Sequence, residues 1–489
     1  MFRSLCKLYP VDQDYPLRTW TLQRRRQVLD GTIYDVLDHS FAEEFINGEY
    51  VPISKRRPSA RYNLCGLVVE DSVSMLFGDG RFPSLHCADE AARLALAAMV
   101  NETMLADVMA DAALRGSVGS VAVRFRVLSK RVFFDVFDTD YLTPVWKASA
   151  PDTLERVIER YKLRGTDLIA MGYAIKKEDE NASFWFQRIW TESAEEWYSP
   201  VKAGRVAPGE TPQVHVLDAE KTQVHNIGFV PMVWIKNLPG KPGIDGACTF
   251  ERGIASQIEM EYQLSQAGRG LKYSSDPLLV IREPAGSDNT LVRTASNAVV
   301  VDEKGDAKLL EIDGTAAEAV VSYVRTLREF ALEVMRGNRG TPDKMGMAQS
   351  GRALELLHEA IIWLAGQMRG PYGNALLRLV NMVVRASREM EITIGGVTAK
   401  FPDDISVTLR WGHWFPPTHH DNLEEAQALS HAAQAGHISR NSAVILTCDR
   451  YDLPDAPAEL VAIEADIAAA DARAIALAAQ TKATETLPD

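Results

Sequence analysis

The chain contains 489 residues, of which 46% are hydrophobic and 24% charged, and its formal net charge is −13. This is ordinary globular usage with enough apolar residues for a buried core, so it excludes a largely disordered chain. The acidic balance also excludes a protein that grips nucleic acid tightly over its whole surface, because such binding depends on many Lys and Arg contacts to phosphates.

Cysteine usage and apolar runs set further limits. The five cysteines are far apart and never arranged as CxxC, so we expect free thiols in a reducing cytosol and neither a disulfide framework nor a zinc site. No segment approaches the roughly 18 uncharged apolar residues of a membrane span. The N-terminus also lacks a long apolar core followed by a cleavage site, so we expect no signal peptide.

The first half of the chain has the pattern of a helical layer followed by a strand-rich layer. Apolar residues at helical spacing predict helices over residues 15–38, 60–77 and 88–115. The period then changes to 2, with β-branched and aromatic residues between turn signals, which predicts strands. These strands are expected at residues 120–127, 131–137, 156–163, 183–190 and 230–237. Such a segregated order of helices and strands indicates the α+β class.

Two long helices flank a small β module in the middle of the chain. Helical patterns cover residues 248–272 and 315–335, although Glu261 interrupts the apolar stripe of the first. Between them, strand-like runs precede and follow DEKGDA, residues 302–307, which we interpret as a turn. The strand-like runs cover residues 277–281, 297–301 and 308–312. The pattern predicts two antiparallel legs with a β tip.

A flexible loop and a third long helix follow the second leg. Residues 337–349 hold three Gly and one Pro, which favours a loop over a kinked helix. Ser350 is the expected N-cap of a helix that extends to about residue 390. The Gly370-Pro371 step is expected to interrupt that helix.

The last part of the chain is expected to be mostly helical. Two strands, around residues 397–401 and 405–411, lead through a proline-rich step to a helical tail that begins near Asp421. Residues 421–489 carry 12 acidic and 4 basic side chains, which is a net charge of −8. The tail therefore supplies most of the net negative charge of the whole chain.

No enzymatic motif has the spacing that its chemistry requires. Gly240-Lys241 is followed by Pro242 where a phosphate-binding loop needs Ser or Thr, so we do not expect ATP hydrolysis. His358 and Glu359 begin like a zinc-protease helix, but Ile362 stands where the second histidine ligand must be. A histidine packed on an amphipathic helix is the simpler interpretation.

The densest polar and aromatic cluster consists of His413, His419 and His420 with Trp411 and Trp414. It leaves open an alternative function, a metal-dependent hydrolase that uses the three histidines. No acid or cysteine completes a recognisable ligand spacing, which disfavours a metal site. Bound metal in stoichiometric amount, and loss of activity on His413→Ala, would support that alternative.

Several passages, in their order and spacing, resemble the portal or head-to-tail connector proteins of tailed double-stranded DNA bacteriophages. Early passages are LCGLVVEDSVSMLFG at 64–78, AALRGSVGSVAVRF at 112–125, DYLTP at 140–144 and HNIGFVPMVWIKN at 225–237. Later ones are YSSDP at 273–277, SGRALELL at 350–357 and the run from LRWGHWFPP to HISRNSAV at 409–444. The similarity spans roughly residues 60–470. None of these passages is a catalytic signature.

The resemblance implies a fold of several parts with an elongated α+β architecture. The parts are a helical and β wing at 1–246, a stem helix at 247–275, a small β-rich clip at 276–313, a second stem helix at 314–336, a tunnel loop at 337–349, a wing helix with strands at 350–420 and a helical crown at 421–489. The two stem helices are expected to be antiparallel.

The resemblance also implies a structural function in the virion, without catalysis, cofactor or metal. Portal subunits form a closed ring of about twelve copies at one capsid vertex, and the ring encloses a channel for double-stranded DNA packaging, retention and ejection. The implied partners are the large terminase ATPase, the major capsid protein and a head-tail adaptor, with assembly in the bacterial cytoplasm. Another structural virion protein, such as an adaptor subunit, is a further alternative, although adaptors are usually shorter.

Non-specific contact with DNA is expected at the tunnel loop. The candidate residues are Arg336, Arg339, Lys344, Met345 and Met347. Basic side chains give transient phosphate contacts, and methionines give soft and adaptable apolar ones. A channel that meets every base sequence in turn has no use for sequence-specific readout.

Overall fold

The structure of the protein is a computed structural model. It describes residues 1–78, 80–204, 214–240, 242–274, 278–284, 301–310, 315–337, 355–356, 358–402, 405–415, 419–450 and 456–485. The chain divides into two compact units. The first comprises Met1–Gly340 and His358–Trp414, and the second comprises Thr341–Leu357 and Phe415–Asp489.

The first unit begins with a helical layer. Its helices are α1 (Phe2–Leu8), α2 (Leu17–Leu29), α3 (Leu64–Phe77), α4 (Glu90–Glu102) and α5 (Leu105–Gly116). The expected helix over 15–38 is too long, because Gly31 takes a left-handed φ of 70° and ends α2. The expected helix over 88–115 is two helices, since Met104 adopts a φ of 48° between α4 and α5.

The strand-rich layer contains two antiparallel sheets. The three-stranded sheet has the order β12-β4-β5, and the six-stranded sheet has the order β11-β9-β8-β7-β6 with β10 paired to β8. Their strands are β4 (Ser120–Leu128), β5 (Arg131–Asp138), β6 (Leu142–Lys147), β7 (Ala150–Arg164), β8 (Ser183–Trp190), β9 (Ala194–Trp197), β10 (Val201–Lys202), β11 (Gln223–Val224) and β12 (Met232–Lys236). All five strands expected here are confirmed, and so is the mixed α+β class.

Short elements complete the first unit. Three are two-stranded pairs: β1 (Phe45–Ile46) with β2 (Glu49–Tyr50), β3 (Ser84–His86) with β17 (Thr408–Arg410), and β15 (Thr393–Ile394) with β16 (Val397–Thr398). A short helix, α6 (Gly165–Ala170), follows β7. The strands expected at 397–401 and 405–411 are therefore present but shorter than predicted.

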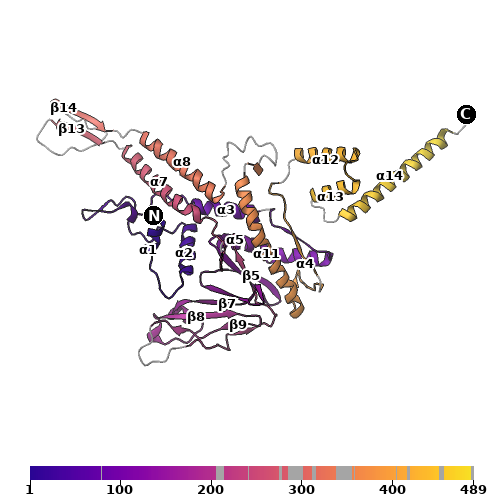
Figure 1. The fold of residues 1–489 in the computed structure, drawn as a ribbon, viewed down its shortest axis with the longest axis horizontal. Coiled ribbons are helices and arrows are strands. Elements are labelled where there is room, and N and C mark those ends of the chain that lie inside the picture. The colour runs from indigo at the N-terminus through magenta and orange to yellow at the C-terminus, as the bar shows by residue number, and fades with distance from the viewer. Residues whose placement is uncertain are drawn as a thin grey trace. The chain divides into compact units, whose positions relative to one another are not determined.

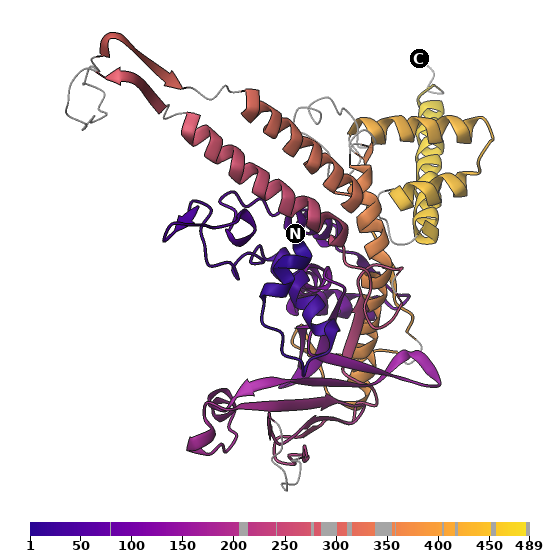
Figure 2. The ribbon, with the colours of Figure 1, turned by 60° about the vertical axis from the view of Figure 1, so that its left-hand side comes forward.

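The long helix α11 (Glu359–Glu389) passes through the core of this unit (Figures 1 and 2). It contacts α3, α5, β12 and β17. The predicted interruption at Gly370-Pro371 is wrong, because α11 continues through Pro371. A proline inside a helix removes one backbone hydrogen bond. Burial of Met368 and Tyr372 on either side of it, each 0% exposed, holds the helix together.

Two long helices and a hairpin form the expected legs and tip. The helices α7 (Ile254–Ser274) and α8 (Thr315–Met335) run side by side (Figures 1 and 2). The antiparallel strands β13 (Leu278–Pro284) and β14 (Val301–Leu310) follow α7 and precede α8. The predicted turn at DEKGDA is wrong, because β14 runs through it.

Strand pairing explains that difference. In the register of the hairpin, Asp306 stands opposite Arg282 and Ala307 stands opposite Ile281. The inter-strand hydrogen bonds of a continuous pair outweigh the turn preference of a short polar segment. Residues 285–300, between the two strands, lie outside the described residues.

The second unit is helical where it is described. It contains α12 (His419–Gln434), α13 (Arg440–Arg450) and α14 (Ala456–Glu485). These helices agree with the helical tail that the sequence predicts. Among the described residues of both units, no helix has the length and apolar character that a membrane crossing requires.

Candidate DNA-channel and assembly site

The C-terminal end of α8 leads into the predicted tunnel loop and has a defined cap. The Gly337 N–H donates to the Leu332 carbonyl at 2.8 Å, and the Arg336 N–H donates to the Glu333 carbonyl at 3.3 Å. This is the hydrogen-bond pattern of a Schellman cap, with Arg336 in the left-handed position at a φ of 58°. A side chain in that conformation costs about 1–2 kcal/mol relative to glycine.

A cation–π contact accompanies this strained position. The Arg336 guanidinium carbon lies 3.3 Å from the ring centroid of Trp363 on α11. Such stacking contributes about 0.5–1 kcal/mol at exposed sites and more where water is excluded, so it offsets part of the strain. Burial, and then the nearby charge of Arg252, lower the pKa of Arg336.

Gly337 brings the end of α8 against the helical layer. A Cβ atom at this position would lie 2.7 Å from a methyl group of Val68 on α3 and 2.6 Å from a methyl group of Leu332. Both contacts are too short for real atoms, so only glycine permits this approach. The loop therefore leaves the leg from a point that is fixed to α3 and α11.

Of the five predicted DNA-contacting residues, the structure describes Arg336 alone. Arg339, Lys344, Met345 and Met347 lie outside the described residues, as does the predicted N-cap Ser350. Arg336 reaches Trp363, which is 56% exposed. Trp363 was not singled out from the sequence. The feature that could have identified it is its position as an aromatic residue one turn into a long helix.

The outer face of α8 is apolar and exposed. Tyr323, Phe330 and Val334 are 48%, 59% and 46% exposed, and their spacing places them along one side of the helix. The inner face of α8, including Leu332 and Met335, is buried in the first unit. The helix therefore has two apolar faces, of which the single chain buries one.

A buried carboxyl group, that of Glu261, fixes the N-terminal half of α7. Glu261 is 1% exposed. One of its oxygens accepts the Tyr62 N–H at 2.9 Å and the Gln257 amide at 3.3 Å, and the other accepts the Tyr34 hydroxyl. Burial raises the pKa of Glu261 to about 7, although the hydrogen bonds and the charge of Arg61 act in the opposite direction.

This Glu261 cluster joins α7 to the helical layer. Gln257 also accepts the N–H of Cys65 at 2.8 Å through its side-chain oxygen, so α7 reaches the first turn of α3. The sequence carried a signal for this cluster, because Glu261 interrupts the apolar stripe of the helix. Two of its partners, Tyr34 and Tyr62, lie about 200 residues away in sequence, so the pattern alone did not identify them.

The histidines of the alternative hypothesis are divided between the two units. His413 is exposed and lies in the first unit, whereas His419 and His420 are the first residues of α12 in the second. The described part of the chain holds no group of three metal-ligating side chains. His358 is 9% exposed and precedes α11, where burial lowers its pKa, in agreement with a packed histidine.

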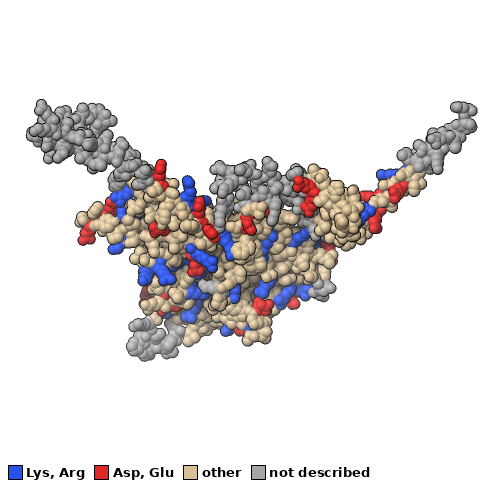
Figure 3. All heavy atoms as spheres, turned by 45° about the horizontal axis from the view of Figure 1, so that its top comes forward, with Lys and Arg blue, Asp and Glu red and all other residues tan. Residues whose placement is uncertain are grey.

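Charged side chains of both signs are interspersed on the face of the molecule that Figure 3 shows. Many described cations pair with carboxylates, such as Arg18 with Asp245 at 2.7 Å.

The sequence match identifies the family. The family model for phage portal proteins of the SPP1 Gp6-like type matches residues 106–472, which is roughly three-quarters of the chain. The chain belongs to this family. It is therefore a structural and non-catalytic component of the virion neck, at the portal vertex. This confirms the resemblance, the virion location and the expectation that the chain is not an enzyme.

No curated protein matches the chain. A chain of the virion of a native gene transfer agent (GTA) particle shares 10% identity over 78% of this chain and 88% of that chain, with a TM-score of 0.37. A chain of the neck of the native GTA particle shares 11% identity over the same fractions, with a TM-score of 0.38. The family assignment rests on the sequence match.

Proposed function

We propose that the protein is a subunit of a closed portal ring of about twelve copies that forms the channel for double-stranded DNA at one capsid vertex. The ring serves genome packaging, retention and ejection. In this proposal α7 and α8 are the stem, the β13–β14 hairpin with residues 276–313 is the clip, and residues 421–489 are the crown. Residues 1–246 and 350–420 form the wing.

The exposed apolar face of α8 is the main observation in support of the ring. Tyr323, Phe330 and Val334 present a stripe that the single chain does not cover. A head-to-tail ring gives each subunit a neighbour on both sides, so a stem helix with apolar residues on two faces packs inward on its own chain and outward on the next. The α8 stripe therefore supports contact between neighbouring stems.

Contact with DNA is assigned to residues 337–349. A duplex that slides through a channel must break every phosphate contact again, so a firm grip along the whole wall would slow it. A short loop with Arg339, Lys344, Met345 and Met347 offers weak and renewable contacts instead. The cap at Arg336 and its contact with Trp363 support the loop at its start.

The proposed partners follow from the same assignment. The clip faces the packaging ATPase, the large terminase subunit, and later the head-tail adaptor, while the wing faces the major capsid protein. No cofactor or metal enters this function. The metal-dependent hydrolase is not proposed further, because membership in a non-catalytic family contradicts it.

Electron microscopy of the purified protein tests the ring. End-on views of negatively stained particles are expected to show rings with a central hole, and Phe330→Asp is expected to shift most of the protein to monomers. Ser322→Asp, an exposed change beside the α8 stripe, is the matched control and should leave the rings intact. Rings of unchanged yield in Phe330→Asp, or monomers in the wild type, would contradict the proposal.

A further inference from the structure

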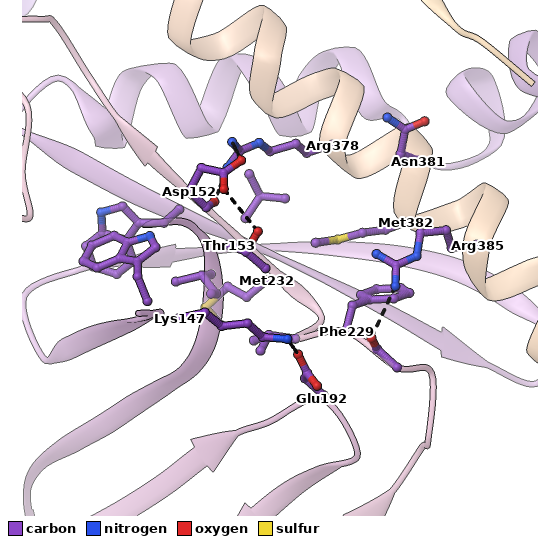
Figure 4. Close-up of a pocket in the computed structure, with 16 residues that line it drawn as sticks. Lys147, Asp152, Thr153, Glu192, Phe229, Met232, Arg378, Asn381, Met382 and Arg385 are labelled. Atoms are coloured by element: carbon purple, nitrogen blue, oxygen red, sulfur yellow. Dashed lines mark hydrogen bonds and ion pairs between the residues drawn. The ribbon is translucent and has the colours of Figure 1, made fainter. Parts of the chain in front are cut away.

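A pocket lies between α11 and the strand-rich layer of the first unit (Figure 4). Its volume is about 280 Å³. Binding sites for small molecules usually measure about 300–1,000 Å³. The pocket therefore lies at the lower end of this range, and its volume accommodates one large side chain of another polypeptide.

The inner part of the pocket is apolar. Met232 on β12 is 1% exposed and Phe229 is 7% exposed, and Met382 of α11 closes the space between them (Figure 4). Burial of a large apolar side chain in such a space contributes about 1.5–3 kcal/mol. The apolar cavity can therefore hold a large side chain, but it does not fix the direction of the chain that carries it.

The rim of the pocket is polar and carries more positive than negative charge. The lining includes Lys147, Arg378 and Arg385, but only two carboxylates, Asp152 and Glu192. Lys147 pairs with Glu192. Arg378 donates to the Asp152 carbonyl at 3.2 Å and makes a long 3.7 Å pair with the Asp152 carboxylate, and both side chains are at least half exposed. Exposed pairs of this kind contribute little and exchange readily.

Arg385 has unused hydrogen-bonding capacity. It donates one N–H to the Gly228 carbonyl at 3.2 Å, and its guanidinium carbon lies 4.7 Å from the ring centroid of Phe229. Within the described residues it has no carboxylate partner. A guanidinium carries five N–H groups in a fork that fits a carboxylate, so most of them are available here.

We propose that this pocket binds a short acidic segment of a partner polypeptide, with one large apolar side chain in the cavity and carboxylates on Arg385 and Arg378. The two arginines are seven residues apart on α11, which is about 10 Å along a helix. Alternate side chains of an extended chain point to the same face, and four residues span about 13 Å. Acidic side chains at positions i and i+4, with the apolar residue at i+2, therefore face the rim and the cavity together, and the long arginine side chains accommodate the difference in span.

The charge of the whole chain makes this binding selective. A formal net charge of −13 repels acidic peptides in general. Binding of an acidic peptide therefore requires a local cationic site and cannot arise from non-specific attraction.

Fluorescence anisotropy with the full chain at low salt tests this site. The probe is a labelled peptide, Gly-Glu-Ser-Phe-Ser-Glu-Gly, and the two comparison peptides replace its Phe by Ser or both Glu by Lys. The probe is expected to bind at least about ten-fold more tightly than either comparison peptide, since loss of one apolar anchor or of the charge pairing removes at least about one decade of affinity. Equal binding of all three peptides would overturn the proposal.

Two substitutions separate the pocket from the rest of the surface. Arg385→Gln is expected to weaken the probe about five- to ten-fold, because it removes a charge-assisted carboxylate contact. Arg388→Gln, one turn further along α11 and outside the pocket, is the matched control. If Arg385→Gln lowers the thermal stability, Arg378→Gln tests the same site with a second variant. Equal losses of probe affinity in the Arg385 and Arg388 variants would refute the site. Unchanged affinity in both the Arg385 and Arg378 variants would also refute it.

Discussion

Replacement of Glu261 by glutamine should remove a pH dependence from the stability of this protein. Burial raises the pKa of this carboxyl to about 7, from 4.5 for an exposed glutamate. Each unit of pKa corresponds to about 1.4 kcal/mol of difference between the folded and unfolded states. The shift therefore corresponds to about 3 kcal/mol in the free energy of unfolding.

The sign follows from proton binding. Between the two pKa values the folded chain keeps the proton on Glu261 and the unfolded chain has lost it. The stability that this group contributes is complete below the unfolded value and is lost as the pH rises through about 7. The wild-type free energy of unfolding is thus expected to fall by about 3 kcal/mol from about pH 4.5 to about pH 8 through this group.

Glutamine retains the geometry of the Glu261 cluster without the titration. Its side-chain oxygen accepts the Tyr62 N–H, and its amide donates to the Tyr34 hydroxyl. Urea unfolding of both proteins at several pH values gives the difference between the two profiles, which should be flatter for Glu261→Gln by the amount above. Glu259→Gln on the same helix is the control, since Glu259 is partly exposed and accepts from Gln263. Parallel profiles for wild type and Glu261→Gln would refute the reasoning.

Three further predictions concern the Arg336–Trp363 contact, the Arg18–Asp245 ion pair and the tunnel loop. Trp363→Ala should lower the free energy of unfolding by about 1 kcal/mol through loss of the stacking with Arg336. Trp363→Phe should retain most of that free energy, and equal losses of the two variants in urea unfolding would contradict this. Arg18→Ala should cost about 3–5 kcal/mol, because Asp245 loses a two-point partner in a largely buried site, and an unchanged thermal midpoint would contradict it. Deletion of residues 338–348 should leave rings intact in electron micrographs but block DNA packaging or retention, and normal packaging would remove the role proposed for the loop.

The sequence alone determined the class, the family resemblance and the order of the main elements. Helix α8 begins and ends where the apolar spacing predicts, and strand β8 matches its predicted residues. These elements follow from residues close in sequence, because helical and strand periodicities are local properties. The leg, tip and leg arrangement follows from the same local patterns.

Tertiary structure decided where elements end and what they contact. The hairpin register moved the turn out of residues 302–307, and burial of Met368 and Tyr372 kept α11 continuous through Pro371. Two partners of Glu261, Tyr34 and Tyr62, come from the N-terminal segment, about 200 residues distant. Burial and strand pairing depend on residues far apart in sequence, and no local pattern records which of them meet. That is the physical reason that the buried carboxyl, the α8 stripe and the α11 pocket became visible only in the folded chain.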